Sequence, residues 1–217
     1  MTQPQTLIQL SRLRLLLWVG CGLLAGCGFG KQDQAVNSLD LGALPVQVAV
    51  SASPPSKAYA LAVPSGLSIG VVQTTDVVWR VGENGMPQAY ATFRWVSPPA
   101  ALVRQRLMDR LSRQGPVLPN GLGDETPVLR MNLQQFEQVF QSDGQSVGVL
   151  TLQVVLTRGD KVLSSEVIQE RVTAQSADAV GGAQALSVAS NQAAERVAVW
   201  VTQTITSPSK SSTQPRL

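Results

Sequence analysis

The sequence contains no histidine among its 217 residues. Ser-His-Asp and Cys-His catalysis are therefore excluded, as are acid and base catalysis by imidazole and metal sites with histidine ligands. Cysteine is also scarce, because the chain has only Cys21 and Cys27. The enzyme classes that remain would depend on paired carboxylates or on a serine with a lysine base.

The patterns that could support such chemistry are weak. Residues 207–210 match the spacing S-x-x-K, but they lie in a serine- and proline-rich tail, 206–217, that we expect to be disordered. The single adjacent pair of acids, at 124–125, lies in a loop and is more simply a solvated turn. Gly121 and Gly123 lack the third glycine and the following helix of a phosphate loop. We therefore predict no catalytic, cofactor-binding or metal-binding residue, and no enzyme activity.

The charge balance does not indicate a nucleic-acid partner. The chain has 17 basic and 14 acidic residues, and removal of residues 1–26 would take away Arg12 and Arg14 but no acid. The remaining 15 basic and 14 acidic residues contain no basic run. Such a body lacks the electrostatic footprint that nucleic-acid binding requires.

Long hydrophobic runs are absent as well. The stretch 15–27 is shorter than the roughly 20 apolar residues of a membrane span, and a polar stretch follows it. Two arginines, about ten mostly apolar residues and then small residues are typical of an export signal. The last four residues, Leu-Ala-Gly-Cys, resemble a bacterial lipobox. We predict a signal peptide over 1–26 and a diacylglycerol on Cys27, with a membrane span or a buried N-terminal helix as the alternatives.

A lipid on Cys27 would determine the compartment. Each buried methylene contributes about 0.8 kcal/mol, and two or more acyl chains hold a protein on a bilayer for long times. The residue after Cys27 is Gly28 and not aspartate, which would signal retention in the inner membrane. Glycine at this position resembles the pattern of outer-membrane lipoproteins. We expect an outer-membrane protein that faces the periplasm. Residues 27–38 would form a lipidated tether, and the body beyond it would have no free thiol.

Periodicity predicts strands and a helix in the first half of the body. Strands are expected at 39–41 and 46–50, and a hairpin at 75–81 and 89–96 around a glycine-containing turn. Phe93 and Trp95 share one face of this hairpin and are interpreted as core.

A helix is expected over 99–114, capped by Ser97 and started by proline. It places Val103, Leu107 and Leu111 on one side. The arginines at 104, 106, 110 and 113 are interpreted as its wet face, with contact to an acidic partner or to lipid headgroups as the alternative.

The second half predicts a sheet closed by a long helix. Three alternating segments, 128–140 with a phase shift, 147–157 and 162–173, indicate an antiparallel meander. A final helix is expected over 178–205. Together these elements predict an α+β body over 39–205, a mostly antiparallel sheet with two main helices packed on one face.

The segment 90–111 begins Tyr-Ala-Thr-Phe-Arg-Trp-Val-Ser-Pro-Pro and continues into the helix. This segment resembles the ABC-type transport auxiliary lipoprotein family, and weaker similarity extends from 39–42 through 133–137 to the alanine-rich helix that ends near 201. The resemblance implies an outer-membrane-anchored periplasmic partner of a lipid transporter that consists of an ABC ATPase, a permease and a mammalian-cell-entry-domain subunit.

Two functions are compatible with the sequence. In the first, the protein is a non-catalytic adaptor between the transporter and the outer membrane. In the second, it is a periplasmic lipid carrier that encloses an acyl chain in an apolar pocket. A homo-oligomer would suit a tubular partner, although no residue requires one.

Overall fold

The computed structural model describes residues 35–44, 60–65 and 68–207. The signal peptide, Cys27, most of the predicted tether and the predicted strand 46–50 lie outside these residues. The described residues belong, apart from residue 35, to one compact unit, 36–217.

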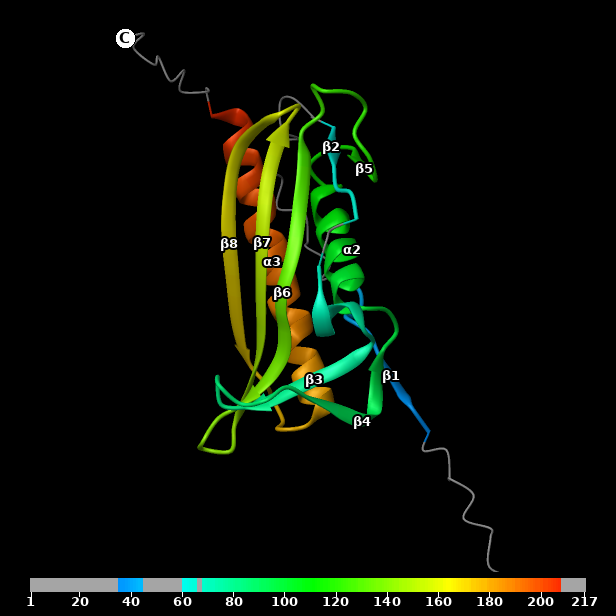
Figure 1. The fold of residues 1–217 in the computed structure, drawn as a ribbon, viewed down its shortest axis with the longest axis vertical. Coiled ribbons are helices and arrows are strands. Elements are labelled where there is room, and N and C mark those ends of the chain that lie inside the picture. The colour runs from blue at the N-terminus through cyan, green and yellow to red at the C-terminus, as the bar shows by residue number, and fades with distance from the viewer. Residues whose placement is uncertain (1–34, 45–59, 66–67, 208–217) are drawn as a thin grey trace, which may run out of the picture. The chain divides into compact units, whose positions relative to one another are not determined.

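The described residues form one sheet of eight strands with two α-helices packed against it, so the predicted fold class is confirmed (Figure 1). Both helices lie behind the sheet in this view. In chain order the elements are β1 (Asn37–Leu39), β2 (Leu61–Ala62), the 3-10 helix η1 (Gly70–Gln73), β3 (Asp76–Val81), β4 (Gln88–Trp95), α2 (Pro99–Leu111), β5 (Val117–Leu118), β6 (Val128–Phe140), β7 (Ser146–Arg158), β8 (Lys161–Thr173) and α3 (Ala179–Thr206).

The predicted meander forms the centre of the sheet. Strands β6, β7 and β8 pair antiparallel along almost their whole length. The phase shift in β6 is a register irregularity between Leu133 and Gln135, as the sequence pattern indicated. Alternate residues of β7, from Leu150 to Leu156, are fully buried against α3, because successive side chains of a strand point to opposite faces.

The second edge of β6 carries parallel pairings that the sequence did not predict. Strand β3 pairs with its C-terminal end, where Trp79 lies opposite Gln138, and β2 pairs with its first residue, Val128. Strand β1 pairs parallel with β4, and β5 pairs parallel with β2. Segments of two or three residues are too short to show a strand period, so only their partners identify them.

Small residues let α3 lie close to the sheet. A Cβ atom on Gly148 of β7 would come within 2.9 Å of the backbone nitrogen of Leu186 and within 3.0 Å of Ala185. Seven alanines of α3 are buried. Asp178 caps the helix by accepting a hydrogen bond from the backbone N–H of Gly181 at 2.8 Å, as predicted from the sequence.

Several predicted boundaries need correction. Strand β1 begins at Asn37, so residues 37 and 38 belong to the folded body and not to the tether. Helix α2 ends at Leu111, three residues early, and its N-cap is Pro98, without a side-chain hydrogen bond from Ser97 or any other residue. Pro99 removes one N–H group from the first turn, and the carbonyl oxygen of Pro98 accepts from the N–H of Ala101 at 2.9 Å.

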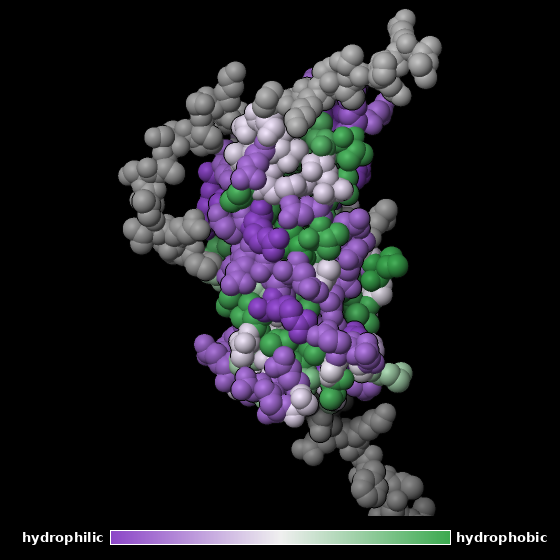
Figure 2. Space-filling view, turned by 90° about the vertical axis from the view of Figure 1, so that its left-hand side faces the viewer, coloured by the Kyte–Doolittle hydropathy of each residue, from purple (hydrophilic) through white to green (hydrophobic). Residues whose placement is uncertain are grey.

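The surface has no single large hydrophobic face on the side where β8 and α3 lie. Figure 2 looks onto that side and shows hydrophobic residues scattered among hydrophilic ones. No described helix is long and apolar enough to cross a membrane.

Candidate functional site

The chain enters the body at β1, nine residues after Cys27 if residues 28–36 are counted. Cys27 itself lies outside the described residues, so the structure does not test its lipidation. At ~3.3 Å per residue, the connection could span at most about 30 Å. An anchored body would therefore stay close to its membrane.

Two helices hold the backbone just after β1. Arg106 of α2 donates from Nη2 to the carbonyl oxygens of Leu41 at 2.8 Å and Gly42 at 2.6 Å. The hydroxyl of Ser187 in α3 donates to the same Leu41 oxygen at 2.5 Å. Burial lowers the pKa of Arg106, which the charges of Asp109 and Asp40 partly offset. We call these contacts of Arg106 and Ser187 with Leu41 and Gly42 the entry clamp.

The entry clamp corrects the interpretation of the α2 arginines as a wet face. Arg106 is only 5% exposed. Arg104 donates to the carbonyl oxygen of Val63 at 3.1 and 2.7 Å, and Arg110 pairs with Glu195 of α3. Arg106 follows Val103 by three residues, and this spacing places both on the same face of a helix, so the sequence pattern is compatible with a buried Arg106. The composition argues against burial, because arginine is seldom buried without a carboxylate partner.

Replacement of Arg106 by methionine is expected to weaken the entry clamp. The free energy of unfolding should fall by about 1–2 kcal/mol, because hydrogen bonds from a charged donor are lost while an apolar side chain still fills the space. Amide hydrogen exchange should accelerate mainly in residues 37–42. Urea unfolding with hydrogen exchange measures both effects. Gln105→Met, on the exposed side of the same helix turn, is the control and should change neither.

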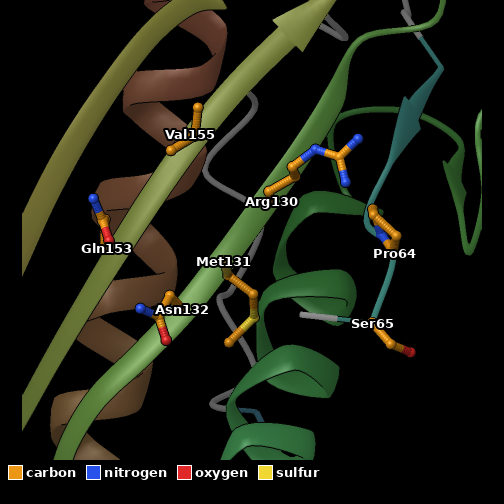
Figure 3. Close-up of a pocket in the computed structure, with 7 residues that line it drawn as sticks. All are labelled: Pro64, Ser65, Arg130, Met131, Asn132, Gln153 and Val155. Carbon is orange, nitrogen blue, oxygen red and sulfur yellow. The ribbon is translucent and has the colours of Figure 1, made fainter. Parts of the chain in front are cut away.

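A shallow cavity of about 270 Å³ lies where the chain after β2 runs beside β6 (Figure 3). Four of its seven lining residues carry polar side chains, namely Ser65, Arg130, Asn132 and Gln153. Pro64, Met131 and Val155 complete the lining. Pockets that enclose small ligands have volumes of roughly 300–1,000 Å³ and bury most of the ligand surface. At about 270 Å³ and open to solvent, this cavity is too small and too shallow to support the lipid-carrier hypothesis.

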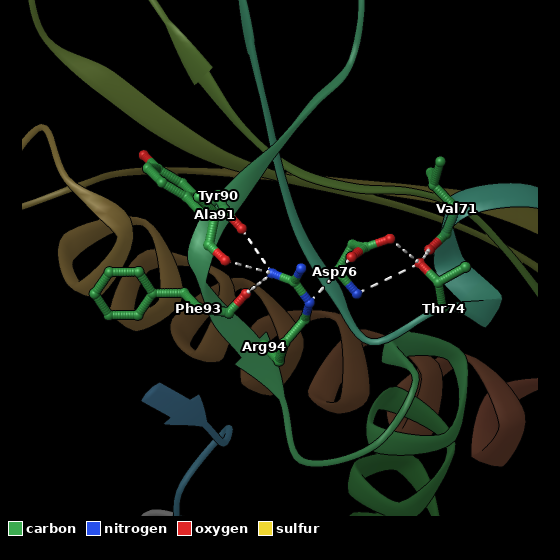
Figure 4. Close-up of polar contacts among 7 residues, drawn as sticks. All are labelled: Val71, Thr74, Asp76, Tyr90, Ala91, Phe93 and Arg94. Carbon is green, nitrogen blue, oxygen red and sulfur yellow. Dashed lines mark hydrogen bonds and ion pairs between the residues drawn. The ribbon is translucent and has the colours of Figure 1, made fainter. Parts of the chain in front are cut away.

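Arg94 of the Phe-Arg-Trp segment stabilises its own strand (Figure 4). The register of β3 and β4 shifts between Asp76 and Val78, and such an irregularity disrupts the local ladder of backbone hydrogen bonds. Nη1 of Arg94 donates to the carbonyl oxygens of Tyr90 and Phe93, both at 2.7 Å. Nε of Arg94 lies 3.3 Å from Oδ1 of Asp76. The most specific segment of the family resemblance thus has a structural role.

Tyr90 joins a buried polar network near the N-terminus of α3. Its hydroxyl donates to Oε1 of Gln138 at 2.8 Å, and Nε2 of Gln138 donates to the hydroxyl of Ser146 at 2.7 Å. Burial, and secondly the charge of Asp178, raises the pKa of Tyr90 to about 12. Hydrogen bonds from Gly181 and Ser176 lower the pKa of Asp178, so its charge persists beside Tyr90.

The raised pKa predicts alkaline sensitivity of the fold. The folded state disfavours the phenolate, so this contribution to stability is complete below the ordinary pKa of 10.0 and is lost as the pH rises towards about 12. Tyr90→Phe should unfold at a lower temperature than the parent at pH 9, through loss of the hydrogen bond, but the gap should narrow above pH 10. Thermal unfolding at a series of pH values measures the gap. An absorbance titration should show a late-ionising tyrosine in the parent that is missing from the variant.

The other sequence motifs stay apart from any common site. Asp124 and Glu125 are exposed in the loop before β6. Ser207 is the C-cap residue that follows α3, while Lys210 lies outside the described residues. Among the described residues, no group of three acidic, cysteine or histidine side chains could hold a metal ion.

The family model of the ABC-type transport auxiliary lipoprotein component matches residues 41–198, which is the greater part of the chain. The chain belongs to this family. It is therefore an auxiliary lipoprotein component of an ABC-type transport system, and a lipid-anchored membrane protein. The family role is that of an auxiliary lipoprotein of a transporter.

Solved structures show the same fold. Protein XCC0632 from Xanthomonas campestris, a DUF330 protein, is 16% identical and superimposes with a TM-score of 0.67, covering 78% of this chain and 96% of that one. An uncharacterized protein is 15% identical, with a TM-score of 0.61 and coverage of 77% and 99%. At these identities the similarity concerns the fold alone. No curated protein matches the sequence.

Proposed function

We propose that this auxiliary lipoprotein is a non-catalytic adaptor of a lipid transporter. Diacylglycerol on Cys27 holds it at the periplasmic face of the outer membrane, and the body docks onto the mammalian-cell-entry-domain subunit of the transporter. The observation that carries the proposal is the family match over residues 41–198, combined with the Leu-Ala-Gly-Cys motif at 24–27.

The connection between anchor and body supports this role. Nine residues, 28–36, separate Cys27 from β1. Directly after that strand, the entry clamp binds the backbone to both helices. A short connection that continues into a clamped backbone restricts the positions of the body relative to the membrane. A protein that must meet a partner at a constant distance from the membrane benefits from such a restriction.

Two variants separate the effect of lipid attachment from the effect of the membrane in which the protein is anchored. Cys27→Ala should yield a folded protein in the soluble periplasmic fraction, and cells that depend on it should lose outer-membrane barrier function as completely as cells without the gene. Gly28→Asp keeps the lipid but carries the signal for inner-membrane retention. It should remain membrane-bound and also fail to restore the barrier.

The two variants give distinct failures of the proposal. Full activity of Cys27→Ala would show that anchoring is unnecessary. Full activity of Gly28→Asp at the inner membrane would show that the outer membrane is the wrong location. Cross-linking of the active protein in cells should capture the mammalian-cell-entry-domain subunit, and capture of only the permease or the ATPase would contradict that choice of partner.

A further inference from the structure

Strand β8 has thirteen residues and pairs, among the described strands, with β7 alone. The pairing runs from Val147 opposite Thr173 to Arg158 opposite Lys161. No other described strand pairs with β8, so it forms an edge of the sheet, as seen at the left of Figure 1. An edge strand of this length is a template for pairing with another strand.

The direction of the free backbone groups follows from one hydrogen bond. The N–H of Ala174 donates to the carbonyl oxygen of Ser146 at 2.9 Å, so this position is a hydrogen-bonded pair. Hydrogen-bonded and non-hydrogen-bonded pairs alternate along an antiparallel ladder. The ladder continues without a shift to Ser164, so the residues between these positions with odd numbers turn their N–H and C=O groups to the free edge. They are Ser165, Val167, Gln169, Arg171 and Thr173.

The centre of this edge lacks the usual protection against pairing. Edge strands are normally guarded by proline, by bulges or by charged side chains. From 162 to 169 the single charged residue is Glu166. Its carboxylate lies 3.5 Å from Nη2 of Arg196 in α3, on the helix side of the sheet. Val167, in contrast, is 57% exposed.

We propose that a second copy of this chain binds this edge, with the two β8 strands antiparallel and Val167 opposite Val167 on a two-fold axis. Val167 then forms a hydrogen-bonded pair with itself, which its free N–H and C=O groups allow. In this register Ser165 lies opposite Gln169, Leu163 opposite Arg171 and Lys161 opposite Thr173. No two like charges lie opposite each other. In the neighbouring register with Glu166 on the two-fold axis, the two Glu166 carboxylates would lie opposite each other. In the register with Ile168 on the axis, Glu166 would lie opposite Glu170.

The pairing also brings the long helices together. A two-fold axis perpendicular to the sheet keeps the helices of both copies on the same face. Arg196 marks the side of α3 that faces β8, because it also lies 3.0 Å from Glu170. Gln192 and Val199 lie one turn before and after it and are exposed. The two α3 helices would face each other through this side, which adds side-chain contact to the strand pairing.

Matched lysine variants test the register. The full chain, extracted in detergent, should sediment as a dimer over a concentration series after subtraction of bound detergent. Val167→Lys places two ammonium groups opposite each other and should raise the dissociation constant at least tenfold. Gln169→Lys adds the same charge to the same strand opposite Ser165, and should change the constant less than threefold.

Cross-linking gives a second readout that does not depend on affinity. Val167→Cys should form a covalent dimer with a short bismaleimide, because the paired Cα atoms lie about 5.5 Å apart. Thr173→Cys should not, because the two sites lie about 40 Å apart at ~3.3 Å per residue. The parent chain controls for reaction of its own cysteines.

Several results would overturn the proposal. In sedimentation, these are a monomer at all concentrations, equal effects of the two lysine variants, and an oligomer that Val167→Lys leaves intact. In cross-linking, it is a yield for Thr173→Cys as high as that for Val167→Cys. Cross-linking of Val167→Cys in cells to a different protein, with none to itself, would assign the edge to that protein instead. These readouts are independent of membrane anchoring, so failure here leaves the proposed function untouched.

Discussion

Replacement of Trp95 by alanine is expected to lower the free energy of unfolding by about 4 kcal/mol. The side chain is 2% exposed, and its ring packs edge-on against Phe136 with the ring centroids 5.4 Å apart. Alanine leaves a cavity between β4 and the centre of β6, which the surrounding strands can close only in part. Urea unfolding followed by circular dichroism measures the loss.

Trp95→Phe is the matched control for this prediction. It keeps an aromatic ring against Phe136 and should cost less than half as much. Because Trp95 is buried, we expect Trp95→Phe to support outer-membrane barrier function fully. A stable Trp95→Phe protein that fails in cells would show that the Phe-Arg-Trp segment acts in transport and not only in the fold.

Replacement of Arg80 by methionine is expected to cost about 3 kcal/mol, because it leaves a buried carboxylate without its cation. Nη2 of Arg80 lies 2.7 Å from Oε2 of Glu137, whose side chain is 2% exposed. Gln135 still donates to the other carboxylate oxygen at 2.5 Å, and this hydrogen bond reduces the loss of stability. Nη1 of Arg80 also donates to the carbonyl oxygen of Gly85 at 3.3 Å, so the hairpin tip should loosen as well. Thermal and urea unfolding of the variant measure the effect.

Two further variants show whether burial is the cause. Adding Glu137→Gln to Arg80→Met removes the unpaired charge and should restore at least about half of the lost stability. Arg171→Met breaks a pair of the same chemistry with Glu83, at 2.6 Å, in which both side chains are largely exposed. That variant should cost less than about 1 kcal/mol. Equal costs for Arg80→Met and Arg171→Met would contradict the role given to burial.

The arginines show most clearly where sequence reasoning stops. Arg94, Arg104 and Arg106 look alike in a helical or alternating pattern, as charges beside apolar neighbours. In the fold, each donates to backbone carbonyl groups: Arg104 and Arg106 to segments far away in sequence, and Arg94 to its own strand beside a register shift. A buried carbonyl group needs a donor, but which carbonyl lacks one is known only when the strands are in place.

The strands of the sheet also fall into two groups, those that the sequence predicts and those that it does not. Each strand of the meander β6–β8 follows its neighbour through a short turn, so alternation and turn residues were enough to predict strands, order and direction. Strands β2 and β5 have two residues each, and β1, β2 and β3 pair parallel with partners more than fifty residues away. Nothing local encodes such partners, and the sequence analysis also did not predict the 3-10 helix η1 before β3.

Periodicity in the sequence was sufficient to predict an α+β body with a regular meander and a small-residue helix, because these patterns act within a few residues of each position. Three features came instead from long-range contacts: the entry clamp of Arg106 and Ser187 after β1, the burial of Glu137 with Arg80, and the position of β8 at the edge of the described sheet. These features depend on which distant segments meet, and long-range packing, not local preference, selects those partners.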